Sequence, residues 1–340
     1  MPKQPSRMMP RDGAGQIDLV GGTGPIMHMI GMPTFMEIYK ADRTFQTQSP
    51  DAIDPNRTKP DVPWAWRISD DAGYANQIVA RVFIQCAEAL KDKTLRRGDK
   101  EQINVALHTC KEDLRNCEKA FLRLATEHDR IIQVIKQSGG VKVEKGVINN
   151  LPQIPNLEHD ATIFLTSSKR AFQSIAEVLN EFYGILIRNA RFDKGTAQLK
   201  NLSPVPTHLL ECLGQFTTLI ERVLNLRNSQ DHTPKETVIV NFHITANELL
   251  IPTWQVLPEP GKPMLPEMRD MLGSLIELAE LSFFHSLMDN LTGHFADAYV
   301  VEEVPLEDRK EGSAIRFRCE LTLVQLPRKG NSGPPQSPAK

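Results

Sequence analysis

Six residues from Arg227 to His232, with the sequence R-N-S-Q-D-H, place an arginine, a neighbouring amide and a histidine at the end of an apolar helix. The guanidinium group of arginine keeps its proton and binds phosphate oxygens with a planar fork, whereas histidine exchanges a proton near neutral pH. Cleavage of RNA by its own 2'-hydroxyl, which leaves a cyclic phosphate, needs proton transfer at the reacting oxygens and a cation beside the developing charge. The stretch therefore predicts RNA cleavage that requires no metal ion.

The spacing of the two residues sets a geometric condition. Five positions along a helix of about 3.6 residues per turn correspond to a rotation of about 140°, so the side chains of Arg227 and His232 diverge on a continuous helix. They converge if the helix loosens over Asp231–Pro234, or if a second copy of the chain supplies the missing group across a symmetry axis.

The bare spacing is a weak signal, because a chain with nine histidines is expected to contain roughly one such match by chance. A second copy, Arg123 to His128, has Leu124 in second place and lies inside a long helix, where we interpret it as a solvated helix face. The structural alternative for the first copy is that Arg227 pairs with Asp231 while the histidine closes the helix end.

Arg227, Asn228 and His232 resemble, position by position, the signature of the HEPN superfamily, small helical-bundle proteins of prokaryotic defence and toxin systems. Their ribonucleases carry an arginine, a polar residue and, after three more positions, a histidine. The resemblance implies a homodimer with two arginines and two histidines in one composite site. Arg227 would neutralise phosphate, His232 would handle the proton and Asn228 would orient both.

The resemblance covers about residues 155–325 and includes the long helix before the motif, the isolated Trp254 and the last long helix. Residues 1–150 gain little from it. Thr233 and Pro234 stand where some HEPN toxins carry a tyrosine modified by a partner antitoxin, so that form of regulation is not expected.

Four basic residues flank the expected RNA path: Lys169, Arg170, Arg188 and Arg191. They would add positive potential for RNA. The structural alternative is that they form a solvated helix face and a helix terminus.

The composition limits the classes of protein and the kinds of site that are expected. A formal net charge of -2 over 340 residues argues against a protein that coats long nucleic acid, and no DNA-specific motif is present. Five scattered cysteines without a CxxC pair predict no metal centre and no disulfide framework, which favours a reducing cytoplasm. No cofactor site is expected, and no membrane span is expected either.

The expected fold class is mainly α: a HEPN-like helical bundle with an added N-terminal helical hairpin and a small C-terminal β-hairpin. Residues near 237–244 alternate like a strand. The expected domains are an extended arm rich in Pro, Gly and Met (1–70), a helical hairpin (71–150), the bundle (151–295), the β-hairpin (296–326) and a disordered tail (327–340).

A second function class stays open. Trp64 and Trp66 lie in a proline-rich segment, which is typical of docking through buried aromatic area. The alternative to a ribonuclease is therefore a non-catalytic helical scaffold that binds a protein partner through residues 1–70.

Overall fold

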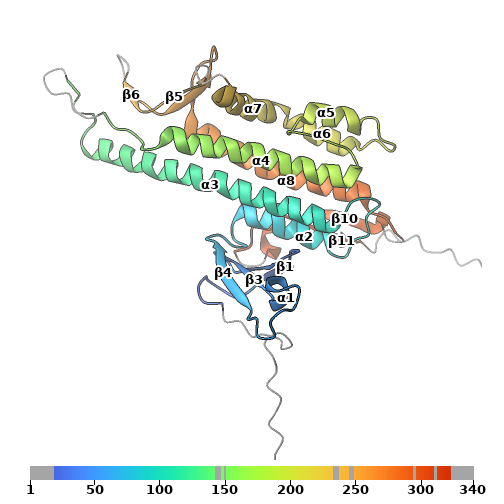
Figure 1. The fold of residues 1–340 in the computed structure, drawn as a ribbon. Helices are drawn as coiled ribbons and strands as arrows, with labels where there is room; N and C mark the ends of the chain where they lie inside the picture. The colour runs from blue at the N-terminus through green and yellow to red at the C-terminus, as the bar shows by residue number, and fades with distance from the viewer. Residues whose placement is uncertain are drawn as a thin grey trace, which may run out of the picture.

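The computed structural model describes residues 19–141, 147–148, 151–232, 237–244, 249–293, 296–309 and 312–322, with the backbone alone at 230–232, 244 and 249–250. Its centre consists of long helices that lie side by side: α3 (Lys100–Gln137), α4 (Leu157–Tyr183) and α8 (Met264–Asn290) (Figure 1). The tail expected at 327–340 lies outside the described residues.

The ends of the long helices follow from local chemistry. The Asp99 carboxylate accepts a hydrogen bond from the backbone N–H of Glu101 at 2.8 Å and so caps the start of α3. Helix α4 has Glu158 and Asp160 in its first turn, where their negative charges interact favourably with the helix dipole. It ends at Gly184, whose φ of 63° lies in the left-handed region.

Helix α4 is enclosed by other helices of the bundle, because it packs against α3, α7 and α8. Phe164, Phe172 and Phe182 are fully buried along it, and each such side chain stabilises the fold by about 1.5–3 kcal/mol. Buried Ser168 bonds back to the carbonyl of Phe164 at 2.8 Å, and its oxygen lies 3.5 Å from the Cys117 sulfur of α3. A small side chain whose hydroxyl is hydrogen-bonded within its own helix thus allows α3 to approach α4 closely.

Short helices cover the opposite side of α4 from α3. These are α5 (Phe192–Leu199), α6 (Thr207–Gln215) and α7 (Thr217–His232), shown in yellow and gold in Figure 1. Helix α7 packs on α4, and α6 packs on α8. The motif helix is therefore part of an outer layer, supported from below by α4.

A four-stranded antiparallel sheet lies on the other side of the bundle (Figure 1). Its strands, in sheet order, are β1 (His28–Gly31), β2 (Met36–Tyr39), β3 (Thr44–Gln48) and β4 (Ala65–Asp70). Helix α1 (Pro50–Ile53) lies between β3 and β4 in the chain, and a π-helical segment, η1 (Ile78–Ile84), leads into α2 (Gln85–Leu90).

Three smaller antiparallel sheets complete the described part of the chain. Strands β5 (Thr237–Val240), β8 (Thr253–Val256) and β9 (Lys262–Pro263) form one of them. The other two pair β6 (His243–Ile244) with β7 (Leu249–Leu250), and β10 (Tyr299–Glu303) with β11 (Phe317–Leu321). Single turns of 3₁₀ helix occur at η2 (Ala296–Ala298) and η3 (Leu306–Asp308).

The prediction of a mainly α fold is wrong. The chain is 52% helical and about 15% strand, with several small antiparallel sheets, so the fold is mixed α and β. Much of the strand content lies within 1–70, where the sequence suggested an extended arm. Strands of four to six residues carry little periodic signal, and Glu37 occupies a buried position that breaks the expected apolar alternation.

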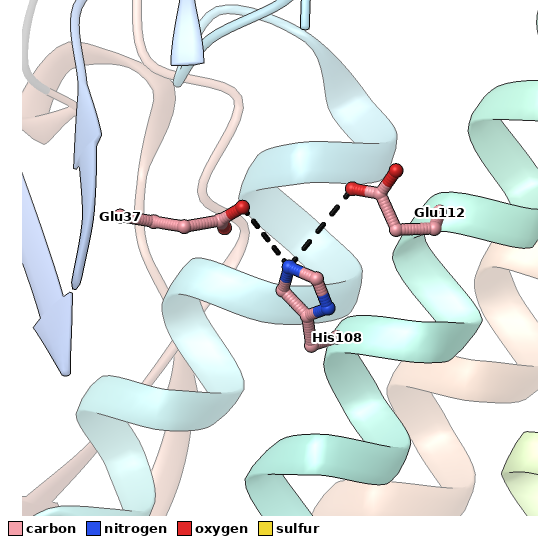
Figure 2. Close-up of side chains that lie close together, drawn as sticks. All are labelled: Glu37, His108 and Glu112. Carbon is pink, nitrogen blue, oxygen red and sulfur yellow. Dashed lines mark hydrogen bonds and ion pairs between the residues drawn. The ribbon is translucent and has the colours of Figure 1, made fainter. Parts of the chain in front are cut away.

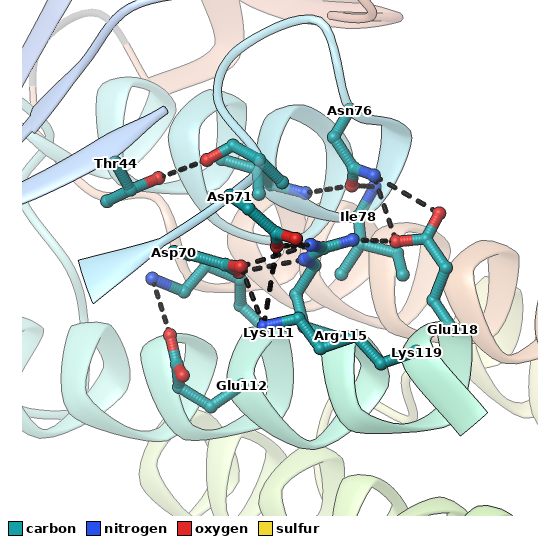
Figure 3. A network of polar contacts seen from close by, with 12 residues as sticks. Thr44, Asp70, Asp71, Asn76, Ile78, Lys111, Glu112, Arg115, Glu118 and Lys119 are labelled. Atoms are coloured by element: carbon teal, nitrogen blue, oxygen red, sulfur yellow. Dashed lines mark hydrogen bonds and ion pairs between the residues drawn. The ribbon is translucent and has the colours of Figure 1, made fainter. Parts of the chain in front are cut away.

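A β-bulge in β4 directs the end of the sheet toward α3. The register pairs Thr44 with Asp70 but Phe45 with Ile68, so one residue of β4 is extra at this point. The bulge turns the Asp70 carboxylate inward, where Arg115 Nε and Lys119 Nζ each lie 2.8 Å away (Figure 3). Burial alone would raise the pKa of Asp70, but the hydrogen bond from Arg115 and the neighbouring charges hold it well below its usual range.

A second buried cluster joins β2 to α3. The carboxylate of fully buried Glu37 lies 2.8 Å from the Lys111 ammonium and 2.9 Å from the His108 Nε2 (Figure 2). The Tyr39 hydroxyl donates a hydrogen bond to the same carboxylate. Burial raises the pKa of Glu37, yet these partners outweigh it and lower the pKa to about 2. The sheet is therefore held to α3 by desolvated charges as well as by apolar packing.

Replacing Lys111 by methionine would leave the Glu37 carboxylate buried without its ammonium partner. We expect the free energy of unfolding to fall by about 3–5 kcal/mol, as for other uncompensated buried charges. Lys136→Met, on the exposed last turn of the same helix, is the matched control and should change it by less than about 0.5 kcal/mol. Urea unfolding followed by circular dichroism measures both values. Equal values for the two variants would contradict a stabilising role for this cluster.

Candidate functional site

The motif residues lie on the last two turns of α7, next to α4. Ile220, Val223 and Leu226 are buried on the inner side of α7, and Arg227 follows them at a half-buried position. The Arg227 Nε donates a hydrogen bond to the Thr166 hydroxyl of α4 at 3.0 Å. The guanidinium group is therefore oriented by the neighbouring helix.

Asn228 makes a second contact to α4. Its side-chain oxygen accepts from the Lys169 ammonium at 3.4 Å, and the amide itself is exposed. Thr166 and Lys169 are three residues apart, so they lie on one face of α4. The structure thus brings Arg227, Asn228 and the sequence-predicted Lys169 together at one helix–helix contact.

His232 is the last residue of α7, and its side chain lies outside the described residues. The backbone stays helical from Thr217 to His232, so the first condition for convergence, a helix that loosens over Asp231–Pro234, is not met at Asp231 or His232; residues 233–236 lie outside the described residues. Five positions along this continuous helix correspond to a rotation of about 140° between the backbone positions of Arg227 and His232. Of the two routes to a joint site, pairing with a second copy of the chain is the one compatible with this backbone.

The other three basic residues predicted to flank the RNA do not gather at the α4–α7 contact. Arg170 is exposed on α4, Arg188 is exposed in the turn after α4, and Arg191 forms an ion pair with Asp193 at 2.7 Å. Among these four residues, Lys169 is the one that hydrogen-bonds to a motif residue in the described part of the chain, whereas Arg191 and Asn228 line the same groove.

That groove lies between α5, α6 and α7 and has a volume of about 700 Å³. Sequence reasoning missed three of its polar residues: Lys200, Glu221 and Asn225. Asn225 could have been found from the sequence, because it precedes Asn228 by three positions and therefore shares its helix face. Glu221, four positions before Asn225, lies on the same face of α7, whereas Lys200 follows α5 and is brought to the groove by tertiary packing.

The second copy of the motif spacing, in α3, is structural. Arg123 pairs with Asp160 of α4 at 2.6 Å, and the His128 ring stacks on Phe242 with 5.6 Å between ring centroids. The two side chains serve different contacts. Arg123 is not merely a solvated residue, since it ties α3 to the first turn of α4.

Trp64 and Trp66 lie far from the motif, on the opposite side of the central bundle. Trp64 is half-buried just before β4, and Trp66 in β4 is 38% exposed with its ring 6.0 Å from that of Phe45. They belong to the N-terminal sheet and take no part in the α4–α7 contact.

Among the described residues, Glu37, His108 and Glu112 lie close enough to share a cation (Figure 2). The Lys111 ammonium, however, lies 2.8 Å from Glu37 and 3.0 Å from Glu112 and forms an ion pair with each. The donor set therefore fits a buried ion-pair cluster better than a metal centre.

One helix in the described part of the chain, α8, is long and apolar enough to cross a membrane. Two thirds (67%) of its most apolar window is buried inside the protein, against α3, α4 and α6. These properties fit a core helix.

Comparisons with known proteins leave the family open: no protein-family model, no curated protein and no solved structure matches this chain.

A buried carboxyl group lies behind the site, on α3. Asp113 is only 7% exposed, and burial raises its pKa to about 6 despite the opposing charge of Arg170; Glu112 and Glu177 raise it further. Arg170 therefore interacts electrostatically with this carboxyl group.

The pKa of Asp113 makes stability depend on pH. Because the folded-state pKa of about 6 exceeds that of an unfolded aspartate, the stability this group contributes is complete below about pH 4 and is lost as the pH rises through 6. Asp113→Asn should therefore be more stable than the wild type above pH 7, by about 1–2 kcal/mol, with no difference near pH 4. Exposed Asp92→Asn is the control. Thermal melts across this pH range measure the effect, and a difference that grows toward acid pH would refute it.

Proposed function

We propose that this chain is a metal-independent endoribonuclease of the HEPN type, acting as a cytoplasmic homodimer in prokaryotic defence or stress response. The α4–α7 contact is the observation that carries the proposal. It holds Arg227 through Thr166 and sets Asn228 beside Lys169, on a helix whose last residue is His232.

The half-buried position of Arg227 suits phosphate chemistry. A cation in a partly desolvated setting interacts more strongly with developing negative charge than one in bulk water. The hydrogen bond to Thr166 fixes the direction of the guanidinium fork before the substrate arrives. Lys169 adds a second cation, and its contact with Asn228 joins it to the motif.

In the proposed reaction the 2'-oxygen of RNA attacks the adjacent phosphorus, and the bond from phosphorus to the 5'-oxygen breaks. His232 of one copy accepts the 2'-hydroxyl proton, and His232 of a second copy donates a proton to the leaving 5'-oxygen. Arg227 neutralises the charge on the phosphorane. The products are a 2',3'-cyclic phosphate and a 5'-hydroxyl end, so atoms and charge balance without a further reactant.

Purified protein incubated with RNA in EDTA tests the proposal. The wild type should release cyclic-phosphate ends, and Arg227→Ala and His232→Ala should each lower the rate about a hundredfold or more. Arg123→Ala and His128→Ala are matched controls with the same spacing, and should retain the wild-type rate if they remain folded. Absence of cleavage by the wild type, or cleavage that is indifferent to His232, would overturn the proposal.

A second candidate function is partner docking through the N-terminal sheet. Strand β4 lies at the end of the strand order, and its Trp66 and Ile68 are 38% and 49% exposed. The register places Ile68 on the same face of the sheet as Phe45, and Met29 adds an exposed side chain on β1. An apolar strand at a sheet edge favours binding of another chain.

The double variant Trp66→Ser, Ile68→Ser checks this second candidate. A tagged chain expressed in its native host should retain a defined partner that the double variant loses and that Arg227→Ala keeps. Leu186→Ser, at a 54% exposed site elsewhere, is the control. Retention of every bound protein by the double variant would exclude docking through β4.

A further inference from the structure

The groove between α5, α6 and α7, named here the α7 groove, ends at the motif. Its volume of about 700 Å³ lies within the range of small-molecule pockets, and Asn228 is one of its lining residues. Because Asn228 also contacts Lys169, whatever occupies the groove lies next to the site proposed for phosphate.

The walls of the groove combine an apolar surface with amides. Phe192, Leu213, Ile220 and Leu224 supply the apolar part, and they come from all three helices. Two side-chain amides, Asn225 and Asn228, stand on the same face of α7. Each amide offers both a donor and an acceptor for hydrogen bonds.

The charges in the groove cancel. Arg191 and Lys200 are balanced by Asp193 and Glu221, and Arg191 is already paired with Asp193 at 2.7 Å. A channel that binds a phosphate backbone needs a clear excess of positive charge. The α7 groove therefore suits the uncharged part of a nucleotide, whereas Arg227 and Lys169 suit its phosphate.

We infer that the α7 groove holds one unpaired nucleobase of the RNA, next to the phosphate at Arg227, and that it sets the base preference of cleavage. This inference rests on the proposed function. A base with its faces on apolar side chains and its edge toward amides is the usual form of single-strand readout. A duplex cannot enter in this way, because its bases are stacked and paired.

Gly214 offers a clean way to close the groove. Gly214 is exposed and lines the groove, and a Cβ atom added there meets nothing within 4 Å, so a larger side chain starts in open space at the groove rather than in the core. Gly214→Trp should fill the groove without disturbing α6. Thr218→Trp, an exposed position on α7 that does not line the groove, is the matched control.

Binding is measured by fluorescence anisotropy with short single strands of 2'-O-methyl RNA, one for each base, in EDTA. Methylation removes the nucleophile, so affinity is measured independently of cleavage. The wild type should prefer one base by about tenfold, and Gly214→Trp should weaken that binding by about tenfold or more. Thr218→Trp should bind like the wild type, and Asn225→Leu should reduce the difference between bases.

Equal affinity of the wild type for all four strands would overturn the inference, as would equal loss of affinity in Gly214→Trp and Thr218→Trp. Tighter binding of a matched duplex than of the single strands would overturn it too. If the groove variants alter binding as expected while the wild type cleaves no RNA, the catalytic proposal falls and the base site stands. If the wild type cleaves RNA and Gly214→Trp leaves that cleavage unchanged, the base site falls and the catalytic proposal stands.

Discussion

The packing of α4 against α3, α7 and α8 is the constraint on which the rest of the molecule depends. Its phenylalanines form the centre of the core, and its serines allow α3 to approach closely. Two polar side chains on the face of α4 toward α7, Thr166 and Lys169, hydrogen-bond to Arg227 and Asn228. The same helix thus stabilises the bundle and orients the residues to which we assign chemistry.

The N-terminal sheet is attached to α3 by buried ion pairs. A bulge in β4 places Asp70 beside Arg115, and the buried Glu37 of β2 pairs with Lys111 and His108 (Figures 2 and 3). Desolvated charges of this kind tolerate few alternative arrangements, because a displaced partner leaves a buried charge without compensation. They fix the sheet on the side of α3 that faces away from α7, so catalysis and docking would occupy separate surfaces.

The sequence predicted the long helices well because their apolar stripes persist over many turns, as in Ile163 to Phe182. It missed the N-terminal sheet because short strands with an inward Glu37 and a bulge before Asp70 break the twofold alternation. For the site, it placed Arg227 and Asn228 near a helix end. It could not show that Thr166 and Lys169 meet them, or that α5 and α6 form a groove beside them, since these contacts span many residues.

The central claim is that a site built at the α4–α7 contact is completed by a second copy of the chain. The most direct test is to co-express wild-type and His232→Ala chains with different tags and to purify the mixed dimer. We expect its rate of RNA cleavage to fall about a hundredfold or more below that of the wild-type dimer, because the proposed reaction uses one histidine from each copy. A mixed dimer that keeps about half of the wild-type rate would contradict the claim, because each chain would then carry a complete site of its own.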